Sequence, residues 1–140
     1  MGELRWDDVR GWMDPALGND MPLHDGCVLG EVREAWRAIA ELARARGWRT
    51  LGPESDGATY HVWPAEGFMV NFFECHDEVV FDVDTRELQG QERLDLLAAF
   101  MRELGLEFGL SVALALEGLD PSQNAYLRYE PTSDEFVVKA

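Results

Sequence analysis

The sequence predicts a single α+β domain, in which about three helices pack on one face of a mostly antiparallel sheet. Three observations support this fold class. The chain has 140 residues, the usual size of one domain. Two long segments repeat apolar residues at the helical period, and several shorter ones are rich in β-branched and aromatic residues. The predicted order of elements (helix, helix, strands, helix, strands) is typical of an α+β domain spanning residues 1–140.

The N-terminal part of the chain predicts one short helix followed by a loop. Residues 3–13 place Trp6, Val9 and Met13 at near-helical spacing, and a Pro after Asp14 ends the pattern. Residues 14–30 are rich in Gly, Pro, Asn and Asp, so we expect them to form a loop.

Two longer helices carry most of the predicted core. The first is expected to end at Gly47, and its apolar stripe consists of Val32, Ala35, Trp36, Ile39, Ala40, Leu42 and Ala43. The second falls within residues 85–104, with Thr85 as a possible N-cap and Gly105 as its expected end. One core is expected to bury Trp36, Ile39, Val79, Phe81, Leu97 and Met101.

Two groups of strands are predicted. The first comprises residues 59–63, 68–75 and 78–83, with a tight turn near His76. In its last strand, alternation sends Val79, Phe81 and Val83 to the core side, and the opposite side receives Glu78, Val80, Asp82 and Asp84.

The last third of the chain predicts the second group of strands. It comprises residues 110–116, 125–129 and 135–138. Turns are expected over residues 118–124 and 131–134.

The charge of the chain limits its partners. The net charge is −15, from 27 acidic and 12 basic residues. Nucleic-acid backbones and anionic membranes are therefore disfavoured, because both require clustered Lys and Arg. A basic protein would be attracted, although the charge also has a simpler explanation in solubility. The acidic excess is greatest over residues 71–87, around the predicted hairpin, so the predicted partner-binding residues are Glu74, Asp77, Glu78, Asp82 and Asp84.

Metal and cofactor sites are not favoured. The spacing of Asp82 and Asp84 suits Mg²⁺ or Mn²⁺, but no phosphate-binding glycine loop accompanies it. Two histidines and two cysteines are the usual ligands of zinc, here His24, Cys27, Cys75 and His76. However, adjacent strand residues such as the last two point to opposite faces. We therefore expect no metal and no cofactor.

The two cysteines and the aromatic residues offer two further candidates. Cys27 and Cys75 are expected to be reduced, because no signal peptide is recognisable. A Cys75 nucleophile with His61 or His76 as its base lacks an oxyanion motif, so catalysis is not favoured. A small-molecule pocket is the other candidate, and its lining would be Tyr60, Trp63, Phe68, Phe72 and Phe73.

One segment carries a family resemblance. The run from Phe81 to Gln91, FDVDTRELQGQ, the helix that follows it to Gly105, and Glu117-Gly118 resemble a segment of small uncharacterised proteins of high-GC bacteria. This resemblance implies a natural, free-standing domain, and it implies no activity, substrate or site residue.

The sequence as a whole favours a cytoplasmic protein–protein interaction domain. Small acidic domains without catalytic motifs are similar in kind to immunity proteins, which neutralise basic toxins by steric and electrostatic blockade. Two alternatives stay open. One is a small-molecule-binding or housekeeping protein, and the other is a divalent-metal-dependent enzyme using Asp82 and Asp84. The sequence predicts no oligomeric state.

Overall fold

The computed structural model describes residues 3–52 and 59–139. Its centre is an eight-stranded antiparallel sheet with the strand order β2-β3-β4-β5-β1-β6-β7-β8. The strands are β1 (Leu23–Val28), β2 (Arg49–Leu51), β3 (Thr59–Ala65), β4 (Phe68–Phe73), β5 (Val80–Asp84), β6 (Val112–Ala115), β7 (Leu127–Glu130) and β8 (Glu135–Val138). The helices are α1 (Trp6–Met13), α2 (Ala35–Arg46), α3 (Gln91–Phe108) and α4 (Pro121–Asn124), with 3₁₀ turns η1 (Pro15–Leu17) and η2 (Thr85–Glu87).

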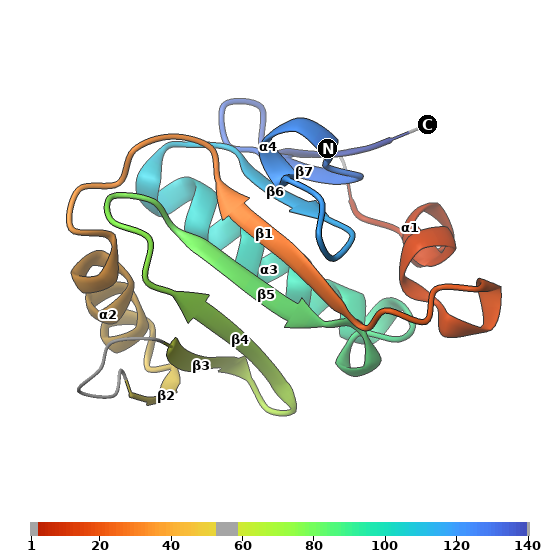
Figure 1. Ribbon diagram of the computed structural model, residues 1–140, viewed down its shortest axis with the longest axis horizontal. Helices are drawn as coiled ribbons and strands as arrows, with labels where there is room; N and C mark the ends of the chain where they lie inside the picture. The colour runs from red at the N-terminus through yellow and green to blue at the C-terminus, as the bar shows by residue number, and fades with distance from the viewer. Residues whose placement is uncertain (1–2, 53–58, 140) are drawn as a thin grey trace.

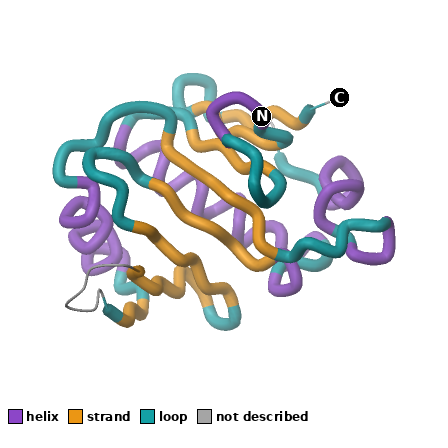
Figure 2. Tube along the Cα trace, viewed as in Figure 1, coloured by secondary structure: helices purple, strands orange, loops and turns teal. Residues whose placement is uncertain are grey.

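The two long helices cover one face of the sheet. In Figure 1, α3 runs behind the central strands and α2 lies beside β2 and β3. Figure 2 shows that the strands nearest the viewer carry no long helix in front of them. The predicted α+β class is therefore confirmed. None of the described helices combines the length and apolar character needed to cross a membrane.

The core lies between α3 and the middle of the sheet. Phe100 of α3 is its centre, because its ring lies 5.4–6.1 Å from those of Phe68, Phe72 and Phe81. Ile39, Val79, Phe81, Leu97 and Met101 are buried as expected. Trp36 is half-buried instead, and it packs on the edge of this core with its ring 5.9 Å from that of Tyr60.

The prediction of a loop over residues 14–30 is wrong for its second half. β1 occupies residues 23–28 and lies in the middle of the sheet, between β5 and β6. Asp25 and Gly26, residue types that are common in turns, lie inside this strand. Gly26 is needed here for a packing reason, since a Cβ atom at this position would lie 2.4 Å from the ring of Phe81. A glycine inside a strand can mark such a close approach as well as a turn.

The ends of the last long helix also differ from the prediction. Thr85 does not cap α3; it lies in η2, and its hydroxyl donates to the carbonyl of Pro22 at 3.0 Å. Gly105 does not end α3 either. It lies inside the helix, and glycine is needed there because a Cβ atom would lie 2.5 Å from the ring of Tyr129. The helix ends at Gly109, whose φ of 64° suits glycine.

The remaining predicted elements are close to those observed. The short N-terminal helix is confirmed, and so is the end of α2 at Gly47. The six predicted strands are all present, with boundaries that differ by one or two residues at some ends. β2 was not predicted, and the expected turn over residues 118–124 contains the single-turn helix α4.

A buried histidine lies between α1 and the sheet. His24 of β1 has its Nδ1 atom 2.8 Å from the hydroxyl of Tyr126, whose ring stacks on Trp12 of α1. Burial lowers the pKa of His24 and raises that of Tyr126. The other ring nitrogen of His24, Nε2, has no hydrogen-bond partner among the described residues. Burial therefore favours the neutral form of His24 in the folded protein.

Replacing Gly26 with alanine tests the close approach of β1 to Phe81. We expect Gly26→Ala to lower the free energy of unfolding by about 1–3 kcal/mol, because the new methyl group overlaps the Phe81 ring. Gly11→Ala is the matched control: no atom lies within 4 Å of the added Cβ, and the residue is inside α1. There alanine should raise stability by about 0.5–1 kcal/mol. Urea denaturation measures both, and equal effects would contradict the packing explanation.

Candidate functional site

One face of the sheet is largely uncovered, and we call it the open face. Along β1 and β3, residues alternate between buried and half-buried, which separates a core side from an outer side. The outer side faces the viewer in Figure 1, and α4 covers only its upper end, over β6 and β1. Functional side chains on a rigid sheet are held more precisely than those on loops.

A line of polar side chains crosses the open face on four adjacent strands. The strand register places His61 opposite Asn71, Asn71 opposite Asp82, and Asp82 opposite Asp25. We call these four residues, from β3, β4, β5 and β1, the polar row. Because neighbours in an antiparallel sheet on one face lie side by side, the register alone brings them together.

Two hydrogen bonds join His61, Asn71 and Asp82 of the polar row, and both are donated in the direction of Asp82. The amide of Asn71 donates from Nδ2 to Oδ1 of Asp82 at 2.9 Å. The Oδ1 atom of Asn71 is therefore left as an acceptor, and it lies 2.6 Å from Nδ1 of His61. His61 must then carry its proton on Nδ1. At the other end, Oδ2 of Asp25 accepts from the backbone N–H of Gly118 at 3.1 Å.

Asp82 is the most unusual member of the polar row. Only 8% of its surface is exposed, although it is a carboxylate on the outer side of the sheet. Burial raises its pKa, the hydrogen bond from Asn71 opposes that effect, and the nearby charges of Asp25, Glu117 and Asp84 raise the pKa further. Among the described residues, neither Asp82 nor Asp25 forms an ion pair. The two carboxylates therefore face each other without a cation.

Apolar side chains flank the polar row. Leu51 of β2 pairs with His61 and so continues the row toward the sheet edge, with 58% of its surface exposed. Phe73, at the end of β4, is 38% exposed. Leu119, in the segment between β6 and α4, is 43% exposed. Exposed apolar groups that gather on one face can mark a protein interaction site.

The five predicted partner-binding residues do not form one exposed face. Asp82 is on the expected side but is buried. Asp84 is half-buried and paired with Arg86 at 2.7 Å, and this ion pair lowers its pKa. Glu78 precedes the start of β5, whereas Asp84 ends it, so the strand separates them. Asp77 accepts a hydrogen bond from the backbone N–H of Glu34 at 3.1 Å, so it has a structural role at the start of α2.

The last of the five, Glu74, is exposed in the connection between β4 and β5. The prediction was therefore correct about the hairpin and its inward face, but wrong about the exposure of Asp82. It also missed Asp25 and Asn71, because the first lay in a segment interpreted as a loop and the second is uncharged. His61 was considered only as a base for Cys75. The buried side of β1 consists of His24, Gly26 and Val28, so the segment lacks the alternation of apolar and polar residues that signals a strand.

The residues of the candidate zinc and Mg²⁺ sites are not arranged to bind a metal together. Within residues 3–52 and 59–139, no group of three His, Cys, Asp or Glu side chains is arranged to hold a metal ion. His24 and Cys27 lie on opposite faces of β1, since one is buried in the core and the other lies on the open face. Asp84 is occupied by Arg86, which removes one of the two proposed Mg²⁺ ligands.

The two thiols are free and poorly reactive. Cys27 and Cys75 form no disulfide. Burial raises the pKa of Cys27 to about 11. Cys75 donates to Glu78 at 3.3 Å, and this hydrogen bond raises the pKa of Cys75. Because the thiolate is the nucleophile, neither cysteine is activated.

The predicted aromatic pocket is divided by the sheet. Tyr60, Phe68 and Phe72 are buried in the core, whereas Trp63 and Phe73 lie on the open face. The five residues therefore do not line one cavity.

We expect Asp82→Asn to stabilise the protein at neutral pH, by about 0.5–2 kcal/mol. The raised pKa means that the ionised carboxylate costs stability, and asparagine keeps an oxygen for the Asn71 amide. The gain should shrink as the pH falls toward the ordinary value of 3.8, because Asp82 of the wild type then becomes protonated. Urea denaturation at several pH values measures this difference. Glu92→Gln, on the exposed side of α3, is the control and should show no comparable gain; a destabilised Asp82→Asn would contradict this account.

Comparison with known proteins adds no assignment. No protein-family model matches the sequence, and no curated protein matches it. The geometry of the open face is therefore what points to a function.

Proposed function

We propose that this protein is a non-enzymatic interaction domain that binds a basic protein through its open face. An immunity-type inhibitor of a basic toxin is the form of this function that the charge and size favour. The observation that carries the proposal is the pair formed by Asp82 and Asp25, two facing carboxylates without a cation among the described residues. Such a pair lowers stability, and a bound cation would remove that cost.

The partner's contact would be an arginine or lysine side chain. A guanidinium between Asp82 and Asp25 would neutralise both carboxylates and form charge-assisted hydrogen bonds. The exposed Leu51, Phe73 and Leu119 would form apolar contacts around it and exclude water. The net charge of −15 would speed the encounter with a cationic surface. Blockade of the residues that a toxin uses to bind phosphate would then inhibit it.

The same features bear on the class of partner, the location of the protein and the enzymatic alternative. The high negative charge disfavours nucleic acid and anionic membranes as partners. Two free, unactivated thiols fit a reducing compartment, so we propose a cytoplasmic location. A divalent-metal enzyme using Asp82 and Asp84 is the least favoured alternative, because Arg86 occupies the second carboxylate.

Removing the two carboxylates without changing their shape tests the proposal. The double variant Asp25→Asn/Asp82→Asn keeps oxygens for Gly118 and Asn71 while it removes two charges. The matched control, Glu92→Gln/Asp95→Asn, removes two charges from the exposed side of α3. Affinity capture from the native lysate, with quantitative mass spectrometry, identifies the partner, and titration of the purified partner measures the dissociation constant.

We expect the wild type and the control to retain the same Lys- or Arg-rich protein in stoichiometric amounts. The open-face variant should bind it at least about tenfold more weakly, with a reduced salt dependence, because contacts to buried charges are worth about 2–5 kcal/mol. Equal affinity of the two double variants, or a stoichiometric partner without a basic surface, would refute the proposal. Circular dichroism confirms that both variants are folded.

A further inference from the structure

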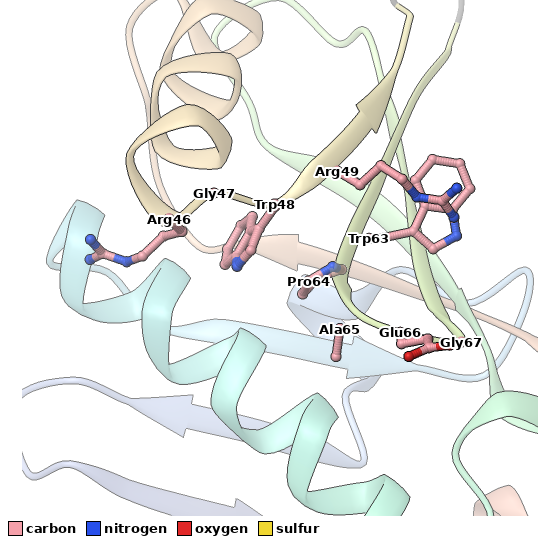
Figure 3. A pocket seen from close by; sticks show the side chains of 9 residues that line it. All are labelled: Arg46, Gly47, Trp48, Arg49, Trp63, Pro64, Ala65, Glu66 and Gly67. Carbon is pink, nitrogen blue, oxygen red and sulfur yellow. The ribbon is translucent and has the colours of Figure 1, made fainter.

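A groove opens at the edge of the sheet beside the polar row, since the ring of Trp63 in its lining lies 6.4 Å from that of His61. It lies between the C-terminal end of α2, the start of β2 and the turn from β3 to β4, and Figure 3 shows the side chains that line it. Its volume is about 550 Å³. Sites for small molecules commonly measure roughly 300–1,000 Å³. The groove opens where β2 pairs only with residues 61–63 of β3 and leaves Pro64 and Ala65 without a partner strand on the β2 side.

The walls of the groove are held in place by contacts outside it. Arg93 of α3 donates to the carbonyls of Glu66 and Gly67, at 3.3 and 2.7 Å, and thereby fixes the turn between β3 and β4. Trp48 packs against Phe100 of the core, with 6.0 Å between the ring centres. The groove is therefore formed before any ligand enters, which lowers the entropic cost of binding.

Arg49 is the cation that is available in the groove. The other lining arginine, Arg46, is already paired with Glu103 of α3. Arg49 instead stacks on the indole of Trp63, with 4.0 Å from its guanidinium carbon to the ring centre, and it has no ion pair among the described residues. Stacking orients the planar guanidinium and leaves its N–H groups for a ligand. A guanidinium fits a carboxylate through two parallel hydrogen bonds.

The rest of the lining indicates what the carboxylate is attached to. Trp48 and Pro64 offer apolar surface, and in the view of Figure 3 they lie between Arg46 and the stacked pair of Arg49 and Trp63. Glu66 adds a negative charge to the same groove. One available cation next to one carboxylate disfavours phosphates and other multiply charged anions. The high negative charge of the whole chain disfavours them further.

We propose that this groove binds a small monocarboxylate with a planar apolar body, such as an aromatic carboxylic acid. Arg49 binds the carboxylate, and Trp48 and Pro64 contact the apolar body. This site is distinct from the Asp25–Asp82 pair that carries the proposed protein interaction, although Trp63 of its lining neighbours His61 of the polar row. If the protein binds a small molecule, this groove is the proposed site, and it differs from the aromatic pocket predicted from the sequence.

Three probes distinguish the chemistry of the ligand. Benzoate has the proposed charge and shape, benzamide is its neutral analogue, and inorganic phosphate carries the charge without the ring. The five tryptophan indole N–H signals in a ¹H–¹⁵N spectrum report the location. Trp48 and Trp63 line the groove, whereas Trp6, Trp12 and Trp36 do not, so they are internal controls. Trp48→Phe and Trp63→Phe assign the signals.

We expect benzoate to shift the signals of Trp48 and Trp63 alone, with a dissociation constant of about 1 mM or tighter. Benzamide and phosphate should each bind at least about tenfold more weakly, since each lacks one of the two contacts. Arg49→Gln should weaken benzoate binding by a similar factor. Arg44→Gln, which changes the same charge on the exposed face of α2, should leave it unchanged.

Several outcomes would overturn the proposal. One is the absence of a benzoate-induced shift at Trp48 and Trp63. Another is equal weakening by Arg49→Gln and Arg44→Gln, which would mean that only the general charge matters. Tighter binding of phosphate than of benzoate would replace the proposed ligand class with a phosphate. Thermal unfolding of each variant confirms that Arg49→Gln remains folded, as expected for an exposed side chain.

Discussion

The contact between Phe81 and the backbone of Gly26 is the constraint on which the rest of the structure depends. Phe81 lies over Gly26 so closely that no side chain fits between them. This contact seats β1 beside β5 and places the ring of Phe81 against Phe100 of α3. Sheet and helix are thus joined through one aromatic ring. The same pairing of β1 with β5 sets Asp25 opposite Asp82 on the other face, so core packing and the candidate site share one register.

The carboxylates of the polar row illustrate a cost that folding alone does not explain. Two facing aspartates, one of them buried, lower stability at neutral pH, whereas Asn or Ser there would not. His24, on the core side of the same strand, has the opposite pH dependence. Its lowered pKa means that stability falls as the pH drops below the ordinary value of 6.5, because the unfolded chain then takes up a proton that the folded protein does not. Only the carboxylate pair lies where a partner can reach it.

The sequence predicted the parts of the structure that follow from local periodicity. The stripe of α2 and the alternation around Val79 and Phe81 depend on neighbours along the chain, and both were correct. The errors at Gly26 and Gly105 have one cause. Each glycine accommodates an aromatic ring from another segment of the chain, and the residues next to the glycine do not predict that contact. Because β1 was not predicted, Asp25 was not recognised as a site residue, and neither was its pairing with Asp82.

The two candidate sites differ in how their charges are balanced, and this difference makes them separable. In the polar row, the uncompensated charge is negative and is held on the middle strands, where backbone pairing on both sides prevents the carboxylates from moving apart. In the groove, the available charge is the positive one of Arg49, on the short edge strand β2. A basic partner on the row would be repelled by Arg49, whereas a bound monocarboxylate would neutralise it. Occupation of the groove would therefore favour the approach of a cationic protein to this side of the open face, by an amount that salt should reduce.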